Sequence, residues 1–128
     1  MEHMVQSIAI RGKFICGQEP INGIRVKLFE NNLNSQSIII DEHMLAINSD
    51  NILNETCTDQ NGQFFINGTT VKVGQIQPIL KVYHNCLHNK LFGLRKIHFL
   101  VPYHFINYGI HAEKVLDLGI FNLEAILP

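Results

Sequence analysis

The segment from Thr58 to Ile66, followed by the segment from Ile76 to Cys86, constrains the fold of this 128-residue chain most strongly. The first segment is typical of two short strands joined by a tight turn at Asn61-Gly62, because both turn residues tolerate the positive φ angles that hairpins require. The second segment is typical of a long, half-buried strand. Together they predict a domain built from β-strands.

The rest of the chain continues the same pattern of short segments. From Ile24 to Leu28, apolar residues alternate with the basic residues Arg25 and Lys27, which predicts a strand with one apolar and one basic face. Alternation recurs at residues 80–84 and 96–99. Three Asn-Gly dipeptides, beginning at Asn22, Asn61 and Asn67, are predicted hairpin turns. Strands at this spacing favour a sandwich or a barrel.

Helical periodicity is weak along the whole chain. We expect at most one short helix, around Asp41–Ala46 or near Tyr103–Asn107, and a long polar loop over residues 31–51. The apolar positions of the alternating segments form the predicted core, which consists of Phe14, Ile24, Val26, Leu28, Phe64, Leu80, Val82, Phe99 and Val101.

Composition excludes some classes of function. Hydrophobic residues make up 46% of the chain and charged residues 16%, and the net charge is −1. A nucleic-acid-binding domain normally has a strong basic excess, so we expect no nucleic-acid partner. There is no run of 18 apolar residues, and hence no predicted transmembrane segment. The first seven residues contain no apolar stretch of the kind found in a secretory signal peptide.

Four segments in order, Gly12–Gly17, Pro20–Glu30, Thr58–Ile66 and Ile76–Cys86, resemble the transthyretin-like family of small secreted nematode proteins. The resemblance extends from about Ser7 to Glu124. It implies an all-β fold, namely an antiparallel, seven- or eight-stranded Greek-key sandwich of transthyretin (prealbumin) type. The implied domain covers residues 8–124, with an N-terminal extension at 1–7 and a C-terminal tail at 125–128.

The resemblance also implies a function. It suggests an extracellular, non-enzymatic protein that binds a cell-surface or anionic ligand, such as a lipid headgroup, a glycan or a protein, without a cofactor. An alternative, by analogy with transthyretin, is a carrier of a small hydrophobic ligand in an oligomer. A hydroxyisourate-type hydrolase is the least favoured alternative. Those enzymes have an early-strand histidine and a C-terminal Tyr-Arg-Gly-Ser, and residues 8–12 and 123–128 contain neither.

The cysteines depart from the family pattern. Relatives tend to have a second cysteine a few residues after the position of Cys86, but residues 87–94 contain none. A disulfide must therefore use another pairing, such as Cys16–Cys57, and one thiol is left over.

The distribution of charge predicts a binding surface. All 11 acidic residues lie outside residues 60–112, whereas this span contains many lysine, arginine and histidine residues. If these cations share a face, they form an electropositive surface that gains charge as histidine titrates near pH 6 to 7. Alternatively, acids on other strands offset them. The candidate surface for an anionic ligand consists of Lys81, His84, His88, Lys90, Arg95, Lys96 and His98.

Three further features concern metal binding, modification and assembly. His84, Cys86 and His88 have side chains that bind zinc, but no fourth ligand is fixed by spacing, so we expect no metal site. Two glycosylation sequons begin at Asn54 and Asn67, and Asn67 is the favoured acceptor because it lies in a predicted turn. Residues 115–123 are apolar on both faces, which predicts either a flanked strand or a homodimer formed through a strand edge.

Overall fold

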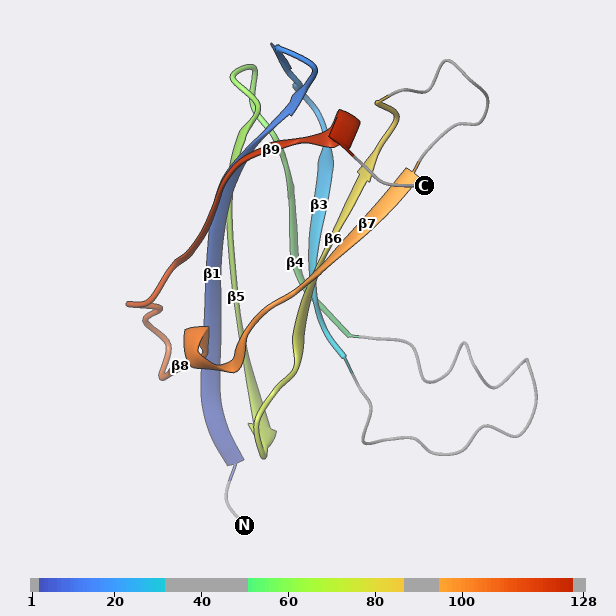
Figure 1. Ribbon diagram of the computed structural model, residues 1–128. Coiled ribbons are helices and arrows are strands. Elements are labelled where there is room, and N and C mark those ends of the chain that lie inside the picture. Colours follow the sequence, from blue (N-terminus) through green and yellow to red (C-terminus); the bar gives the residue numbers. More distant parts are fainter. Residues whose placement is uncertain (1–2, 32–50, 87–94, 126–128) are drawn as a thin grey trace, which may run out of the picture.

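The fold is a sandwich of two β-sheets (Figure 1). The computed structural model describes residues 3–31, 51–86 and 95–125. The strands are β1 (His3–Cys16), β2 (Glu19–Pro20), β3 (Arg25–Glu30), β4 (Asn51–Cys57), β5 (Gln63–Val73), β6 (Pro78–His84), β7 (Arg95–Leu100), β8 (Asn107–Tyr108) and β9 (Leu116–Asn122). The all-β prediction is confirmed. The described residues form nine strands instead of seven or eight, and two of them, β2 and β8, are only two residues long.

One sheet is organised around β1, and the other has the order β4-β3-β6-β7. Along most of its length β1 pairs antiparallel with β5, from His3 opposite Val73 to Lys13 opposite Gln63. It also pairs antiparallel with β2 and β8, and parallel with β9. Every other strand pair is antiparallel, as predicted.

The structure moves one predicted domain boundary. Residues 1–7 were expected to form an N-terminal extension, but β1 begins at His3. Residues 3–7 pair with β5, and both Gln6 and Ser7 are buried. The expected boundary came from where the family resemblance begins, whereas the Gln6 and Ser7 side chains are hydrogen-bonded within the domain.

The predicted core is confirmed. Eight of the nine predicted residues are buried, and Phe99 is partly buried and packs against them. Phe14 lies at the centre of an aromatic cluster, with its ring stacked on Phe64 at 5.2 Å and on Phe99 at 6.4 Å between centroids. These contacts join both sheets, so the alternating strands bury their apolar faces against one another.

Two of the three predicted Asn-Gly turns are present. At the turn ending in Gly62, φ is +76°, and a side chain there would collide with the carbonyl oxygen of Phe14. The third prediction was wrong, since Asn67 and Gly68 lie inside β5. Gly68 is required for a different reason: a Cβ atom there would lie 2.8 Å from the Cβ of Leu53 on β4.

Helical structure is limited in the described part of the chain to two single-turn 3-10 helices. These are η3 (Tyr103–Phe105) and η4 (Leu123–Ala125). The first lies within the predicted range 103–107. The other predicted helix, at residues 41–46, lies outside the described residues.

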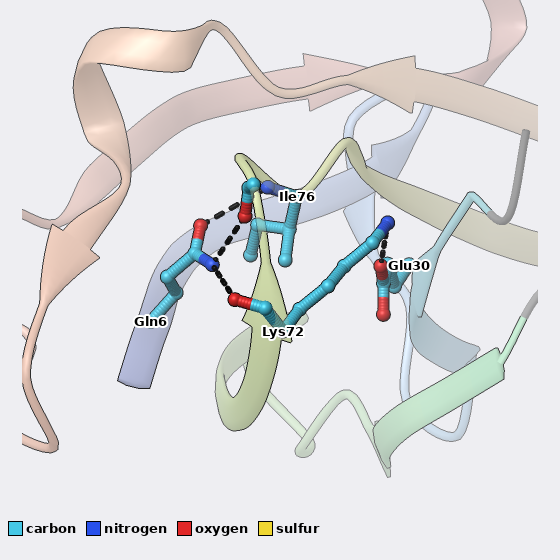
Figure 2. Close-up of polar contacts among 5 residues, drawn as sticks. Gln6, Glu30, Lys72 and Ile76 are labelled. Carbon is cyan, nitrogen blue, oxygen red and sulfur yellow. Dashed lines mark hydrogen bonds and ion pairs between the residues drawn. The ribbon is translucent and has the colours of Figure 1, made fainter. Parts of the chain in front are cut away.

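A buried glutamine fixes the connection between β5 and β6 (Figure 2). Gln6 is fully buried on β1, where its side-chain nitrogen donates to the carbonyl of Gly74 at 2.8 Å. Its side-chain oxygen accepts a hydrogen bond from the backbone N–H of Ile76 at 3.0 Å. Because these backbone groups would otherwise be buried without partners, Gln6 holds the chain where it crosses between sheets.

An ion pair links the two sheets near the same place. In Figure 2 the Lys72 side chain extends from β5 toward the Glu30 carboxylate at the end of β3. The side chain of Glu30 is 5% exposed and that of Lys72 is 18% exposed. A pair this deeply buried is costly to form, and breaking it leaves one charge in the interior without its partner.

The predicted Cys16–Cys57 disulfide was wrong. Cys16 at the end of β1 is bonded to Cys86, which follows β6, with 5.9 Å between their Cα atoms. Cys57 is an exposed free thiol at the end of β4, opposite Arg25. The sandwich brings Cys16 and Cys86 together because the ends of β1 and β6 meet at one end of the core, whereas the Cys57 side chain points to solvent.

Replacing Lys72 with methionine should lower the free energy of unfolding by about 3 kcal/mol, because the Glu30 carboxylate is left buried without its cation. Urea unfolding followed by circular dichroism measures this change. The matched control is Glu55→Gln, which breaks the exposed Lys27–Glu55 pair and should cost less than about 1 kcal/mol. Equal effects of the two substitutions would show that the buried pair has no special role.

Replacing both Cys16 and Cys86 with serine should lower stability by about 4 kcal/mol, because their disulfide closes a chain segment with a sequence separation of 70. Cys57→Ser should leave stability nearly unchanged. Peptide mapping without reduction provides a direct check, and recovery of a Cys16–Cys57 peptide would contradict the assignment.

Candidate binding surface

The outward face of the β4-β3-β6-β7 sheet carries most of the cations that the structure brings together. Strand register places Lys27, Lys81 and His98 directly opposite one another on β3, β6 and β7. The next cross-strand row consists of Arg25, Tyr83 and Lys96. We call these two rows the basic face. Alternation explains it, because the residues between them on each strand point into the core.

Aromatic rings lie between the cations. The Lys27 ammonium is 5.3 Å from the centroid of the Tyr83 ring, and the Lys96 ammonium is 5.9 Å from the same centroid. The Lys81 ammonium lies 4.3 Å from the centre of the Phe29 ring. These cation–π contacts hold the side chains against the sheet, so the positive groups form a flat array.

Negative charge is scarce on this face. Among the described residues of these four strands, Glu55 is the only acid on the outward side, and its carboxylate is 3.9 Å from the Lys27 ammonium. Glu30, the other acid on these strands, is buried. Arg25 and Lys96 form no ion pair with any described residue. Like charges placed opposite each other, such as Lys27 and Lys81, repel, and the Glu55 carboxylate offsets part of that repulsion.

Three of the seven predicted surface residues, Lys81, Lys96 and His98, lie on the basic face. His84 does not, since it is 3% exposed and its Nδ1 accepts a hydrogen bond from the backbone N–H of Cys86 at 3.0 Å. Arg95 pairs with His84 in register, so alternation separates it from Lys96. His88 and Lys90 lie outside the described residues.

Sequence reasoning missed three members of the basic face and one residue that borders it. Arg25 and Lys27 were recognised as the basic side of an alternating strand but were not connected with the cations of residues 81–98. Tyr83 and Phe29 were not considered. The signal that could have found them is the shared alternation of the two segments, provided that the segments pair in the register seen here.

The basic face borders an apolar groove. The cross-strand row next to the basic face contains Phe29, Ile79 and Leu100. The Leu100 side chain is 76% exposed. Ile79 and Leu100, together with Val101 and Tyr103, line a groove of about 410 Å³. A small apolar molecule or the edge of a larger ligand would fit such a space.

A second, more polar groove of about 900 Å³ crosses the outward face of the other sheet. It includes an ion pair between Arg11 and Asp117, with 3.1 Å between Nε and Oδ2. The backbone N–H of Gly119 and the adjacent Arg11 guanidinium lower the pKa of Asp117 below its usual value. The groove mixes both signs of charge, so it favours no single class of ligand.

The predictions about metal binding, homodimer formation and membrane insertion concern other parts of the chain. The thiol of Cys86 is used in the disulfide, which removes it as a zinc ligand. No cluster of metal-binding side chains is found in the described ranges. β9 pairs with β1 along one edge and with no described strand along the other, and Ile120 is 67% exposed. A homodimer through this edge remains a prediction. No helix in the described part of the chain is long and apolar enough to cross a membrane.

The family match and the similar relatives point to the same family. A family description titled "Transthyretin-like family" matches residues 11–102. Transthyretin-like protein 46 of Caenorhabditis elegans is 36% identical over 94% of this chain and 62% of its own length. The chain therefore spans less than two thirds of that relative. Transthyretin-like proteins 2 and 5 of the same organism are each 30% identical over 96% of this chain, and 78% and 80% of their own lengths are covered.

Among solved structures, a 9R-lipoxygenase from Cyanothece has a TM-score of 0.43 and 14% identity, over 92% of this chain and 16% of that chain. A likeness this low carries no argument about fold or function.

Proposed function

Because this chain belongs to the transthyretin-like family, we propose that it is an extracellular, non-enzymatic binding protein. It recognises an anionic ligand, either a lipid headgroup, a glycan or an acidic protein surface, through the basic face. The observation that carries this proposal is the pairing of Lys27, Lys81 and His98 in one cross-strand row, next to a row with Arg25 and Lys96.

The physical case rests on the concentration of positive charge in two adjacent rows. An anionic surface that lies over these rows meets several cations at once. The cation–π contacts hold the lysine side chains in place before a ligand arrives, so less side-chain freedom is lost on binding. This is the design expected of a preorganised site for a negatively charged surface.

The Cys16–Cys86 disulfide supports an extracellular location, since disulfides form and persist in oxidising environments. The proposal of a non-enzymatic role rests on the first strand, in which the early-strand histidine of the hydroxyisourate hydrolases has no counterpart at residues 8–12.

The apolar groove at Ile79, Leu100 and Tyr103 favours a second candidate function, the carriage of a small hydrophobic ligand. An apolar dye whose fluorescence rises with the protein and falls after Leu100→Glu would support this candidate. Unchanged dye fluorescence in the variant would count against it.

Binding to three anionic probes tests the main proposal: heparin, vesicles containing an anionic phospholipid, and polyglutamate. Whichever probe binds, the Lys81→Gln/Lys96→Gln variant should bind about 30-fold more weakly, since each basic residue contributes about 1 kcal/mol at an anionic surface. Raised salt should weaken binding through screening. The relative affinities for the three probes distinguish glycan, lipid and protein as the source of the anion.

The matched control is Lys13→Gln/Lys114→Gln, which removes the same charge from outside the basic face and should change affinity by less than about threefold. Equal loss in the two double variants, or no binding to any probe at 50 mM salt (a concentration about threefold below physiological), would contradict the proposal.

A further inference from the structure

Phe65 and two residues of a glycosylation sequon, Asn67 and Thr69, lie on the outward face of β5. Side chains alternate along a strand, so Phe65, Asn67 and Thr69 all point to the same side. All three are exposed, and the Phe65 side chain is 54% exposed. Asn67 and Thr69 are the first and third residues of an N-glycosylation sequon. The sequon thus has a solvent-exposed aromatic ring two residues before the acceptor.

We propose that Asn67 carries an N-linked glycan whose first sugar packs on the ring of Phe65. The inference rests on the proposed function in one respect, because it requires the chain to pass through the secretory route. In the transfer step, the Asn67 amide nitrogen loses a proton and forms a bond to C1 of the sugar. The bond from C1 to a polyisoprenyl diphosphate donor breaks, and the diphosphate is the leaving group.

The surroundings of Asn67 leave room for a sugar. Asn67 itself is exposed, and its neighbour across the sheet, Ala9, is buried and has only a single methyl group as its side chain. The Asn67 side chain forms no hydrogen bond with a described residue. Its backbone pairs with β1, and its carbonyl also accepts a hydrogen bond from the Asn54 side chain. A glycan attached there therefore displaces no side-chain contact of the folded domain.

The Phe65 ring supplies a surface for that sugar. Successive residues on one face of a strand are about 6.6–6.8 Å apart, a distance that a sugar bridges by leaning along β5. A pyranose has a face of C–H groups, which an aromatic ring attracts through the negative charge of its π face. The same contact covers an apolar side chain that otherwise faces water.

The other sequon provides a comparison within the same chain. The Asn54 side-chain nitrogen donates to the Asn67 carbonyl at 2.7 Å, and its oxygen accepts a hydrogen bond from the Glu55 N–H at 2.8 Å. The residue two positions before Asn54 is Ile52, which has no aromatic ring. A glycan at Asn54 would therefore lack the packing partner that Asn67 has.

The first experiment expresses the full chain behind the signal sequence of an unrelated secreted protein, in cells that perform N-glycosylation. Intact mass is measured on the total cell lysate and on the medium, before and after treatment with peptide N-glycosidase. A glycan mass that disappears in both Asn67→Gln and Thr69→Ala, and persists in Asn54→Gln, supports the proposal. A parent protein without a glycan at Asn67 overturns it, whether or not the chain leaves the cell.

The second experiment tests the packing on Phe65. Enzymatic removal of the glycan should lower the Tm of the parent protein by about 3–5 °C, as expected for the loss of an aromatic contact in a domain of this size. This decrease in Tm on deglycosylation should disappear in Phe65→Leu and persist in Phe65→Tyr. Val71→Thr, which removes an exposed apolar side chain from the same face outside the sequon, should leave the loss unchanged. An equal Tm loss in Phe65→Leu overturns the packing.

Heparin affinity measured on the same preparations separates this inference from the proposed function. The glycan lies on the sheet opposite the basic face, so glycosylated and deglycosylated protein should bind equally. Failure of both to bind heparin, anionic vesicles and polyglutamate alike would contradict the proposed function while leaving the assignment of Asn67 intact.

Discussion

The pairing of β3 with β6 in a single register is the constraint on which the rest of the structure depends. In this register Val26 faces Val82 and Leu28 faces Leu80 in the core, while Lys27 faces Lys81 on the outside. A slip of one residue would move the apolar side chains to water and the lysines to the interior, which the core cannot tolerate. The register that buries the apolar side chains in the core therefore also sets the spacing of the cations on the outward face.

Much of the fold was predictable because its signals are local. The alternation from Ile24 to Leu28 and the turn at Gly62 each depend on a few neighbouring residues, and both are present in the structure. The Asn67-Gly68 prediction failed for a tertiary reason, since Gly68 provides space for Leu53 from another strand. An isolated Asn-Gly dipeptide does not reveal whether its glycine is needed for a turn or for a close approach.

The binding surface was only partly predictable because it combines segments that are distant in the sequence. Charge counting found Lys81, Lys96 and His98, but Arg25 and Lys27 join them only through the β3–β6 register. The same limit explains the disulfide, as nothing local shows that Cys16 lies near Cys86 rather than Cys57. His84 was misplaced although alternation along β6 puts it on the same face as Leu80 and Val82, where it is buried.

The position of β1 in its sheet has a consequence for synthesis of the protein. The first strand of the chain pairs with β5, β8 and β9, and the last of these ends at residue 122. The sheet cannot close until the ribosome has released residue 122, so β1 lacks one of its partner strands until then. Strand pairs between residues so far apart in the sequence form slowly. The unpaired β1 strand is therefore the segment to which a chaperone would bind during synthesis.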